Sequence, residues 1–303
     1  MLKNRFSLLA LALYLSFALI SCGSNDDELP FDEEFKGKVA TYTISGNNIT
    51  LTKDWGSSST FYANPTNQMQ LWNFYANLIP SDLRPEFIKL ELFADKDDDT
   101  GAYVSPINPN DLSKWELGYN MAYAWSNTFE FNKSDVAFNS IHEYAHVLTL
   151  NNTQLVAGGS EDTCANYFPG EGCSREAAYI NQFFTNYWTD IFDESQTFEE
   201  DDDEAFFAFY DKYADRFVSE YASTNPEEDI AESFARFVLL NQPTGNQIKD
   251  QKVRFFYDFQ ELIVVRDRIR ANVDFQFDIN QVGEARLEKF LFRRNELNRT
   301  RKH

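Results

Sequence analysis

Two of the three histidines in this chain stand four residues apart, and a glutamate directly follows the first. His142, Glu143 and His146 form the pattern His-Glu-x-x-His within residues 140–148. Residues four apart lie on one face of a helix, so both imidazoles can bind the same zinc ion. Glu143 then stands beside the metal, where it can accept a proton from a water molecule. The pattern therefore predicts the chemistry of a zinc hydrolase.

A second stretch offers the ligand that this pair still lacks. A catalytic zinc takes three protein ligands and leaves a position for water. The remaining histidine, His303, is the last residue of the chain, so we expect a carboxylate as the third ligand. Glu228 and Glu232 lie four apart in a predicted helix that Asn225 caps and Pro226 begins. The residues by themselves leave open which of the two carboxylates binds the metal.

The elements that must position these residues can be predicted from the hydrophobic pattern. The helix that carries the His-Glu-x-x-His pattern should begin near Ser134 or Asp135, either of which can cap it, and run to about Leu150. Its sequence is amphipathic, so we expect the histidines and Glu143 to face a cleft opposite an apolar face. That apolar face comprises Ala137, Ile141, Ala145 and Leu148.

The remaining pattern predicts an α+β protein. With 43% hydrophobic and 16% aromatic residues, the chain has the composition of a folded globular protein. Strand patterns occur at 39–52, as a hairpin, and at 87–93 and 115–124. Helical patterns occur at 69–78, 175–192, 204–222 and 246–272. We expect a β-rich part to about residue 130, a helical part at 131–273 and a tail at 274–303.

The first residues have the pattern of an export signal. Lys3 and Arg5 precede an apolar run at 6–20, which ends at Ser21 and Cys22. This arrangement resembles a bacterial lipobox, which implies cleavage of residues 1–21 and attachment of lipid to Cys22. The alternatives are an ordinary signal peptide or a short signal anchor. Residues 22–37 then form an acidic tether, similar to the export signal of surface-exposed lipoproteins of Bacteroidetes.

Cysteine content and charge agree with an exported protein. Cys164 and Cys173 lie nine residues apart, and in an exported chain we expect them to form a disulfide rather than a second metal site, because no histidine is nearby. The net charge is −21, and it becomes −23 without residues 1–21, which hold two basic and no acidic residues. So negative a chain is a poor partner for nucleic acid or for an anionic membrane surface.

Taken together, the two stretches resemble gluzincin-type zinc metallopeptidases. The chain is most similar to the zinc-binding metallopeptidase lipoproteins of Bacteroidetes, many of which are encoded beside TonB-dependent nutrient-import systems. The resemblance covers the lipobox and roughly residues 65–242. The stretch 221–237 also resembles the corresponding part of anthrax lethal factor. This resemblance implies a zincin-like α+β fold in which a small mixed sheet accompanies the active-site helix and the C-terminal half is mainly helical.

The resemblance also implies roles for particular residues. It makes Glu228 the third zinc ligand, while Glu232 would orient a ligand histidine and remains the alternative ligand. Tyr221 would face the scissile carbonyl group, and the predicted strand at 115–124 would lie along the cleft, where a substrate backbone can pair with it. The chain departs from thermolysin-like enzymes because 82 positions separate His146 from Glu228.

The function that we expect is a zinc-dependent metallopeptidase, an endopeptidase rather than an exopeptidase, that hydrolyses peptides or proteins. The lipid would anchor it to the outer membrane, at the cell surface in preference to the periplasmic face, with a TonB-dependent import complex as a candidate partner. One alternative is a degenerate zincin that binds peptide or glycan for such a complex. Another is a zinc enzyme that hydrolyses a non-peptide amide or ester.

Overall fold

The computed structural model describes residues 35–98, 100–125, 130–197 and 202–282. The predicted signal sequence, Cys22 and most of the acidic tether lie outside these residues, as do His303 and most of the predicted tail. None of the helices within the described ranges has the length and apolar character needed to span a membrane.

A five-stranded mixed sheet forms the N-terminal half, and the whole chain is an α+β protein, as the sequence predicted. The order of the strands across the sheet is β2-β1-β3-β5-β4. Only β3 and β5 run parallel, and the other neighbours are antiparallel. The bounds of these strands are β1 Gly37–Ser45, β2 Asn48–Asp54, β3 Phe87–Ala94, β4 Ala102–Asn108 and β5 Asp111–Asn120.

The predicted hairpin is confirmed and joins β1 to β2. Ser45 pairs with Asn48, so the connection contains two residues, Gly46 and Asn47. Gly46 has a φ of 60°, a left-handed conformation that glycine adopts without steric penalty. β2 is the outer strand on this side of the sheet, and β1 connects the hairpin to β3 through antiparallel pairing.

The strand predicted at 115–124 is confirmed as β5, but its predicted end and its predicted role in pairing with a substrate were wrong. β5 ends at Asn120, whose side chain caps the short helix α2 (Met121–Ala124). β5 also pairs with β3 on one side and β4 on the other, so its backbone is already engaged at both edges. The outer strand on this side is β4, which the sequence did not reveal. It contains Pro106, a residue that sheets tolerate at their edges, and its residues do not alternate regularly between apolar and polar.

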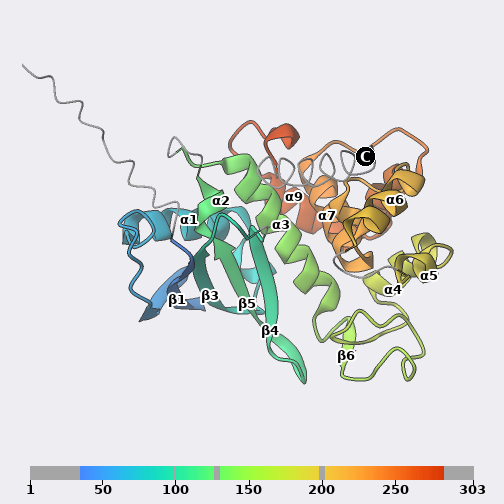
Figure 1. Cartoon of the computed structure of the whole chain (residues 1–303), viewed down its shortest axis with the longest axis horizontal. Coiled ribbons are helices and arrows are strands. Elements are labelled where there is room, and N and C mark those ends of the chain that lie inside the picture. The colour runs from blue at the N-terminus through green and yellow to red at the C-terminus, as the bar shows by residue number, and fades with distance from the viewer. Residues whose placement is uncertain (1–34, 99, 126–129, 198–201, 283–303) are drawn as a thin grey trace, which may run out of the picture.

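The helix with the His-Glu-x-x-His pattern lies between the sheet and the C-terminal helices (Figure 1). This helix, α3 (Lys133–Leu150), is capped by Asn132, whose side chain accepts a hydrogen bond from the backbone N–H of Asp135. The predicted caps Ser134 and Asp135 instead lie inside its first turn. The expected amphipathic pattern was also wrong, because nearly every residue of α3 is buried, on the sheet side and on the side of α7.

The C-terminal half is mainly helical, but its helices are shorter than the sequence predicted. The range 175–192 contains α4 (Tyr179–Tyr187), and the range 204–222 overlaps α6 (Asp203–Tyr213) and the 3₁₀ turn η2 (Tyr221–Ser223). The other bounds are α1 Pro65–Leu78, η1 Ser81–Leu83, α5 Phe192–Ser195, α7 Pro226–Leu239, α8 Ile248–Phe255, η3 Phe256–Asp258, α9 Gln260–Arg270 and η4 Ile279–Gln281.

Residues 246–272 do not form one continuous helix, because the chain leaves helical geometry at η3. The Phe256 ring packs 5.2 Å from that of Phe234 and 5.3 Å from that of Phe237, both in α7. Phe259 then takes an extended conformation before α9 begins. Burial of aromatic side chains against α7 thus outweighs the local helical pattern. Both α8 and α9 contact α7, so this region packs against the helix that carries Glu228 and Glu232.

Two short strands within the predicted helical part form a second, small sheet. β6 (Leu155–Ala157) pairs antiparallel with β7 (Gly172–Ser174). Cys164 and Cys173 form the predicted disulfide, which closes the loop between these strands. We call residues 164–173 the disulfide loop. Gly159 packs against it, and a side chain there would meet the sulfur of Cys173.

Candidate metal centre

The centre is formed where α3 and α7 pack against each other. Asn225 caps α7 by accepting a hydrogen bond from the backbone N–H of Glu228 at 2.8 Å, and Pro226 is the first helical residue. Proline suits this position because its missing N–H would have no partner within the helix. The predicted start of α7 is therefore confirmed. This cap fixes the backbone of Glu228 in the first turn, which faces α3.

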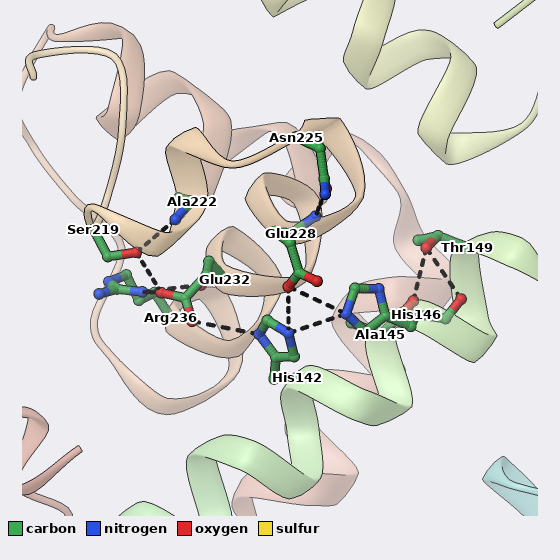
Figure 2. Close-up of polar contacts among 10 residues, drawn as sticks. All are labelled: His142, Ala145, His146, Thr149, Ser219, Ala222, Asn225, Glu228, Glu232 and Arg236. Atoms are coloured by element: carbon green, nitrogen blue, oxygen red, sulfur yellow. Dashed lines mark hydrogen bonds and ion pairs between the residues drawn. The ribbon is translucent and has the colours of Figure 1, made fainter. Parts of the chain in front are cut away.

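Three potential ligand atoms converge between the two helices (Figure 2). Nε2 of His142 lies 3.0 Å from Nε2 of His146 and 2.9 Å from Oε2 of Glu228. The remaining separation, from His146 Nε2 to the same Glu228 oxygen, is 3.5 Å. The three atoms thus form a compact triangle at the contact of α3 and α7.

These separations fit a single zinc ion. In a tetrahedral site with bonds of about 2.0–2.1 Å, neighbouring ligand atoms lie roughly 3.3 Å apart. The observed separations of 2.9, 3.0 and 3.5 Å lie close to this value on both sides. Two neutral imidazoles and one carboxylate are also a donor set that zinc prefers, and one that leaves a position for water. His142, His146 and Glu228 therefore could hold a metal ion.

Glu232 contacts the other nitrogen of His142. Its Oε1 lies 3.4 Å from Nδ1, longer than an ordinary hydrogen bond. Its Oε2 accepts hydrogen bonds from the Ser219 hydroxyl at 2.7 Å and from the Arg236 guanidinium at 2.6 Å. The two glutamates therefore contact different nitrogens of His142. Glu228 contacts Nε2, which also lies near His146, and Glu232 contacts Nδ1. A carboxylate in this second position fixes the tautomer and the ring orientation of a metal-binding histidine.

The ionisable groups of the centre shift one another's pKa values. Burial by itself lowers the pKa of His142, but the contacts with Glu228 and Glu232 and the charges of Glu228 and Glu143 raise it to about 10. Burial raises the pKa of Glu228, but His146 and His142 hold it well below its ordinary value. For Glu232, burial is likewise outweighed, by Arg236 first, and its pKa falls to about 2. Both carboxylates are therefore ionised at neutral pH and favour a cation between the helices.

Glu143 and Tyr221 flank this triangle. Glu143 follows His142 on α3, is buried, and is close enough for its charge to help raise the pKa of His142. Tyr221 begins η2, and its ring centre lies 5.9 Å from that of His142. With 38% of its surface exposed, Tyr221 is accessible from solvent beside the buried ligands.

The structure adds residues that the sequence prediction missed. Ser219 both donates to Glu232 and accepts from the backbone N–H of Ala222, and so it ties η2 to α7. Arg236 lies one turn after Glu232 on the same helix, a spacing that could have revealed the ion pair. From the disulfide loop, the Tyr167 hydroxyl donates to Glu227, the neighbour of Glu228, at 2.7 Å. No sequence signal links Ser219 or Tyr167 to the centre, because tertiary packing brings them there.

Comparisons of the chain with models of known protein families, with curated proteins and with solved structures found no match.

Proposed function

We propose that this protein is a zinc-dependent peptidase and that His142, His146 and Glu228 are its metal ligands. The observation that carries the proposal is the convergence of two imidazole nitrogens and one carboxylate oxygen within 3.5 Å of one another. Glu143, adjacent in sequence to the first ligand, supplies the carboxylate that hydrolysis requires. This combination of a His₂Glu donor set and a neighbouring base is the arrangement of metal-dependent hydrolases.

Each residue has a distinct task in the proposed reaction. Bound zinc would supply Lewis-acid chemistry, because it acidifies a water molecule and polarises a carbonyl group. Glu143 accepts the proton of the attacking water and delivers it to the departing amine. Tyr221, on the exposed side of His142, donates a hydrogen bond to the carbonyl oxygen as negative charge develops on it. Glu232 holds the His142 ring through Nδ1.

The position of β4 supports a peptide as substrate and an endopeptidase as the type of enzyme. β4 is the outer strand of the sheet, and it packs beside α3. An extended peptide can add to an outer strand through main-chain hydrogen bonds. Such binding requires no free chain end in the substrate, so internal peptide bonds are accessible. The assignment of this role to β4 replaces the earlier expectation for the strand at 115–124.

For the cellular location, we propose that lipid on Cys22 anchors the protein to the outer membrane, on the basis of the signal pattern at 1–22. The site would then act outside the cytoplasm, in agreement with the disulfide between Cys164 and Cys173. A cell-surface position and an association with a TonB-dependent import complex are part of the same proposal. They rest on the sequence resemblance.

The decisive test combines zinc content with cleavage of a mixed peptide library, for the wild type and for Glu143→Gln. We expect about one zinc per chain in both proteins, and cleavage by the wild type that a chelator abolishes and added zinc restores. Glu143→Gln should keep the zinc and lose about 10²-fold or more in rate, because it lacks the base. A wild type without zinc, or a variant as active as the wild type, would overturn the proposal. Zinc and peptide binding without cleavage would instead support the peptide-binding alternative.

A further inference from the structure

A fully buried ion pair lies on the side of α7 that packs against α4 and α8. The ammonium group of Lys252, in α8, contacts Oδ2 of Asp229, and neither side chain has any exposed surface. The indole N–H of Trp188, at the end of α4, donates to the same oxygen at 2.8 Å. The Ser233 hydroxyl lies 3.5 Å from the other oxygen, Oδ1. The aromatic ring of Phe217 lies 4.2 Å from the ammonium group.

Stability alone does not explain such a pair. Two charges removed from water lose their hydration, and a buried pair is on average no more stabilising than apolar side chains of similar volume. The nearby rings of Phe217 and Trp188 are aromatic, and the indole N–H of Trp188 is a polar group that takes Asp229 as its acceptor. The ion pair can fix the orientation of the side chains that form it, because hydrogen bonds depend on angle, whereas apolar contacts are not directional.

The pair is placed to control the orientation of Glu228. Asp229 follows Glu228 directly, and successive residues of a helix point about 100° apart. A bond that fixes the direction of Asp229 toward α4 and α8 therefore also fixes that of Glu228 toward α3. The position of the Glu228 carboxylate depends strongly on the rotation of α7 about its axis. A rotation by about 20° moves an atom 5–6 Å from the axis by about 2 Å. Metal–ligand bonds tolerate only about 0.2 Å.

We infer that Asp229 and Lys252, together with Trp188, are positioning residues that fix the rotation of α7 and so place Glu228 for metal binding. This inference rests on the proposed metal centre and deepens it. The polar contacts of the pair are with Trp188 and Ser233, and not with His142, His146 or Glu228. Their effect reaches the centre through the helix backbone, which the Asn225 cap already holds at one end.

The experiment replaces the ion pair by an apolar pair, Asp229→Leu/Lys252→Met, and measures the zinc dissociation constant by competition with a chromophoric chelator. The visible absorption of the Co²⁺-loaded protein reports the ligand geometry independently of any enzymatic activity. We expect zinc affinity to fall about tenfold or more, the range for residues that support metal ligands, and the Co²⁺ spectrum to change.

A matched control separates positioning from a general loss of stability. Lys38 and Glu91 form an ion pair in the sheet at 2.6 Å, in which Glu91 is buried and Lys38 is half-exposed, and the Tyr103 hydroxyl is an additional donor to Glu91. The variant Lys38→Met/Glu91→Leu should keep the wild-type zinc affinity and Co²⁺ spectrum, whatever its thermal stability.

Three possible results of these zinc-binding measurements would contradict the inference. The inference is wrong if the folded Asp229→Leu/Lys252→Met variant has the zinc affinity and Co²⁺ spectrum of the wild type. It is also wrong if the control variant loses as much zinc affinity. Neither result contradicts the proposed metal centre itself. If the double variant fails to fold, Trp188→Phe decides, because it removes only the N–H donor; we expect its zinc affinity to fall about threefold, and an unchanged value refutes the inference. A wild type that binds no zinc removes the proposed function together with the inference.

Discussion

The carboxylate of Glu232 lies 3.4 Å from Nδ1 of His142, the ring nitrogen that does not face His146. Because Ser219 and Arg236 both bind its second oxygen, this carboxylate is held in place independently of any metal. Glu228 approaches the same imidazole from the other nitrogen, at 2.9 Å. In the proposed metal centre, Glu228 is therefore a ligand, and Glu232 supports the ligand His142.

This arrangement predicts different effects for the two glutamates. Glu232→Ala should weaken zinc binding about 10–100-fold, the range for groups that orient a ligand histidine. Glu228→Ala should weaken it further, because it removes a ligand atom. Both dissociation constants can be measured by chelator competition. Glu261→Ala serves as the control, since Glu261 lies on α9 and bonds to Tyr179 at 2.8 Å. A larger loss for Glu232→Ala than for Glu228→Ala would reverse the assignment of the ligand.

Zinc binding should release a proton from His142. The pKa of this ring is raised to about 10 in the metal-free protein, so at pH 7–8 the ring is protonated and must lose that proton to bind the metal. Zinc affinity should therefore rise up to about tenfold per pH unit across this range. Isothermal calorimetry in buffers of different ionisation enthalpy measures the released protons directly. A binding heat that does not depend on the buffer would contradict the prediction.

The same pKa shift sets the pH dependence of stability in the metal-free protein. The folded-state pKa of His142, about 10, lies above its ordinary value of 6.5. Its contribution to the free energy of unfolding is therefore fully present below pH 6.5 and is lost as the pH rises toward 10. Glu232 has the opposite sign, because its pKa falls to about 2, and its contribution is lost as the pH falls from about 4.5 toward 2. Urea unfolding of the metal-free protein across pH 3–10 should show both losses.

The sequence was most informative where the relevant spacing is local. His142 and His146 share a helix face, and the Asn225-Pro226 start of α7 sets which glutamates belong to its first two turns. Such relationships depend on helix geometry alone, so they can be read without knowledge of the tertiary structure.

The sequence was less informative where packing decides the outcome. The helix expected across 246–272 is interrupted because Phe256 packs against α7, and no local pattern encodes that contact. β4 was missed because an outer strand with Pro106 lacks a regular alternation. The choice between Glu228 and Glu232 depends on the rotation of α7 relative to α3, and this rotation is a property of the assembled core.

Removal of the disulfide should destabilise the protein measurably. Cys164 and Cys173 close a loop with a sequence separation of nine, for which chain entropy predicts a stabilisation of about 2–3 kcal/mol. The variant Cys164→Ser/Cys173→Ser should lower the free energy of unfolding by this amount, as measured by urea unfolding. Reductant should shift the wild type by the same amount and leave the variant unchanged. Equal urea midpoints for the two proteins would show that the loop is held by its other contacts, such as that of Tyr167 with Glu227.

Gly118 in β5 should tolerate no side chain, because the ring of Tyr103 from β4 covers it. A Cβ atom at this position would lie 2.0 Å from the nearest atom of that ring. The ring is also fixed, since its hydroxyl donates to both Glu91 and Glu116. Gly118→Ala should therefore lower the free energy of unfolding by about 1–3 kcal/mol. In a Tyr103→Ala background the same substitution should change it by less than about 0.5 kcal/mol, and equal effects in both backgrounds would contradict the close contact.

Tyr221→Phe should separate catalysis from metal binding. The hydroxyl is the only atom that this substitution removes, and the ring, which lies 5.9 Å from that of His142, is retained. If the hydroxyl stabilises the developing negative charge on the carbonyl oxygen, kcat should fall about 10²–10³-fold, while zinc affinity and thermal stability remain those of the wild type. The measurement is the rate of cleavage of a peptide selected from the library, with zinc content determined on the same samples. Tyr213→Phe is a matched control, because the Tyr213 hydroxyl bonds to Glu194 and lies on α6. An unchanged kcat for Tyr221→Phe would assign Tyr221 to packing against His142 and would leave the carbonyl oxygen to be stabilised by other groups.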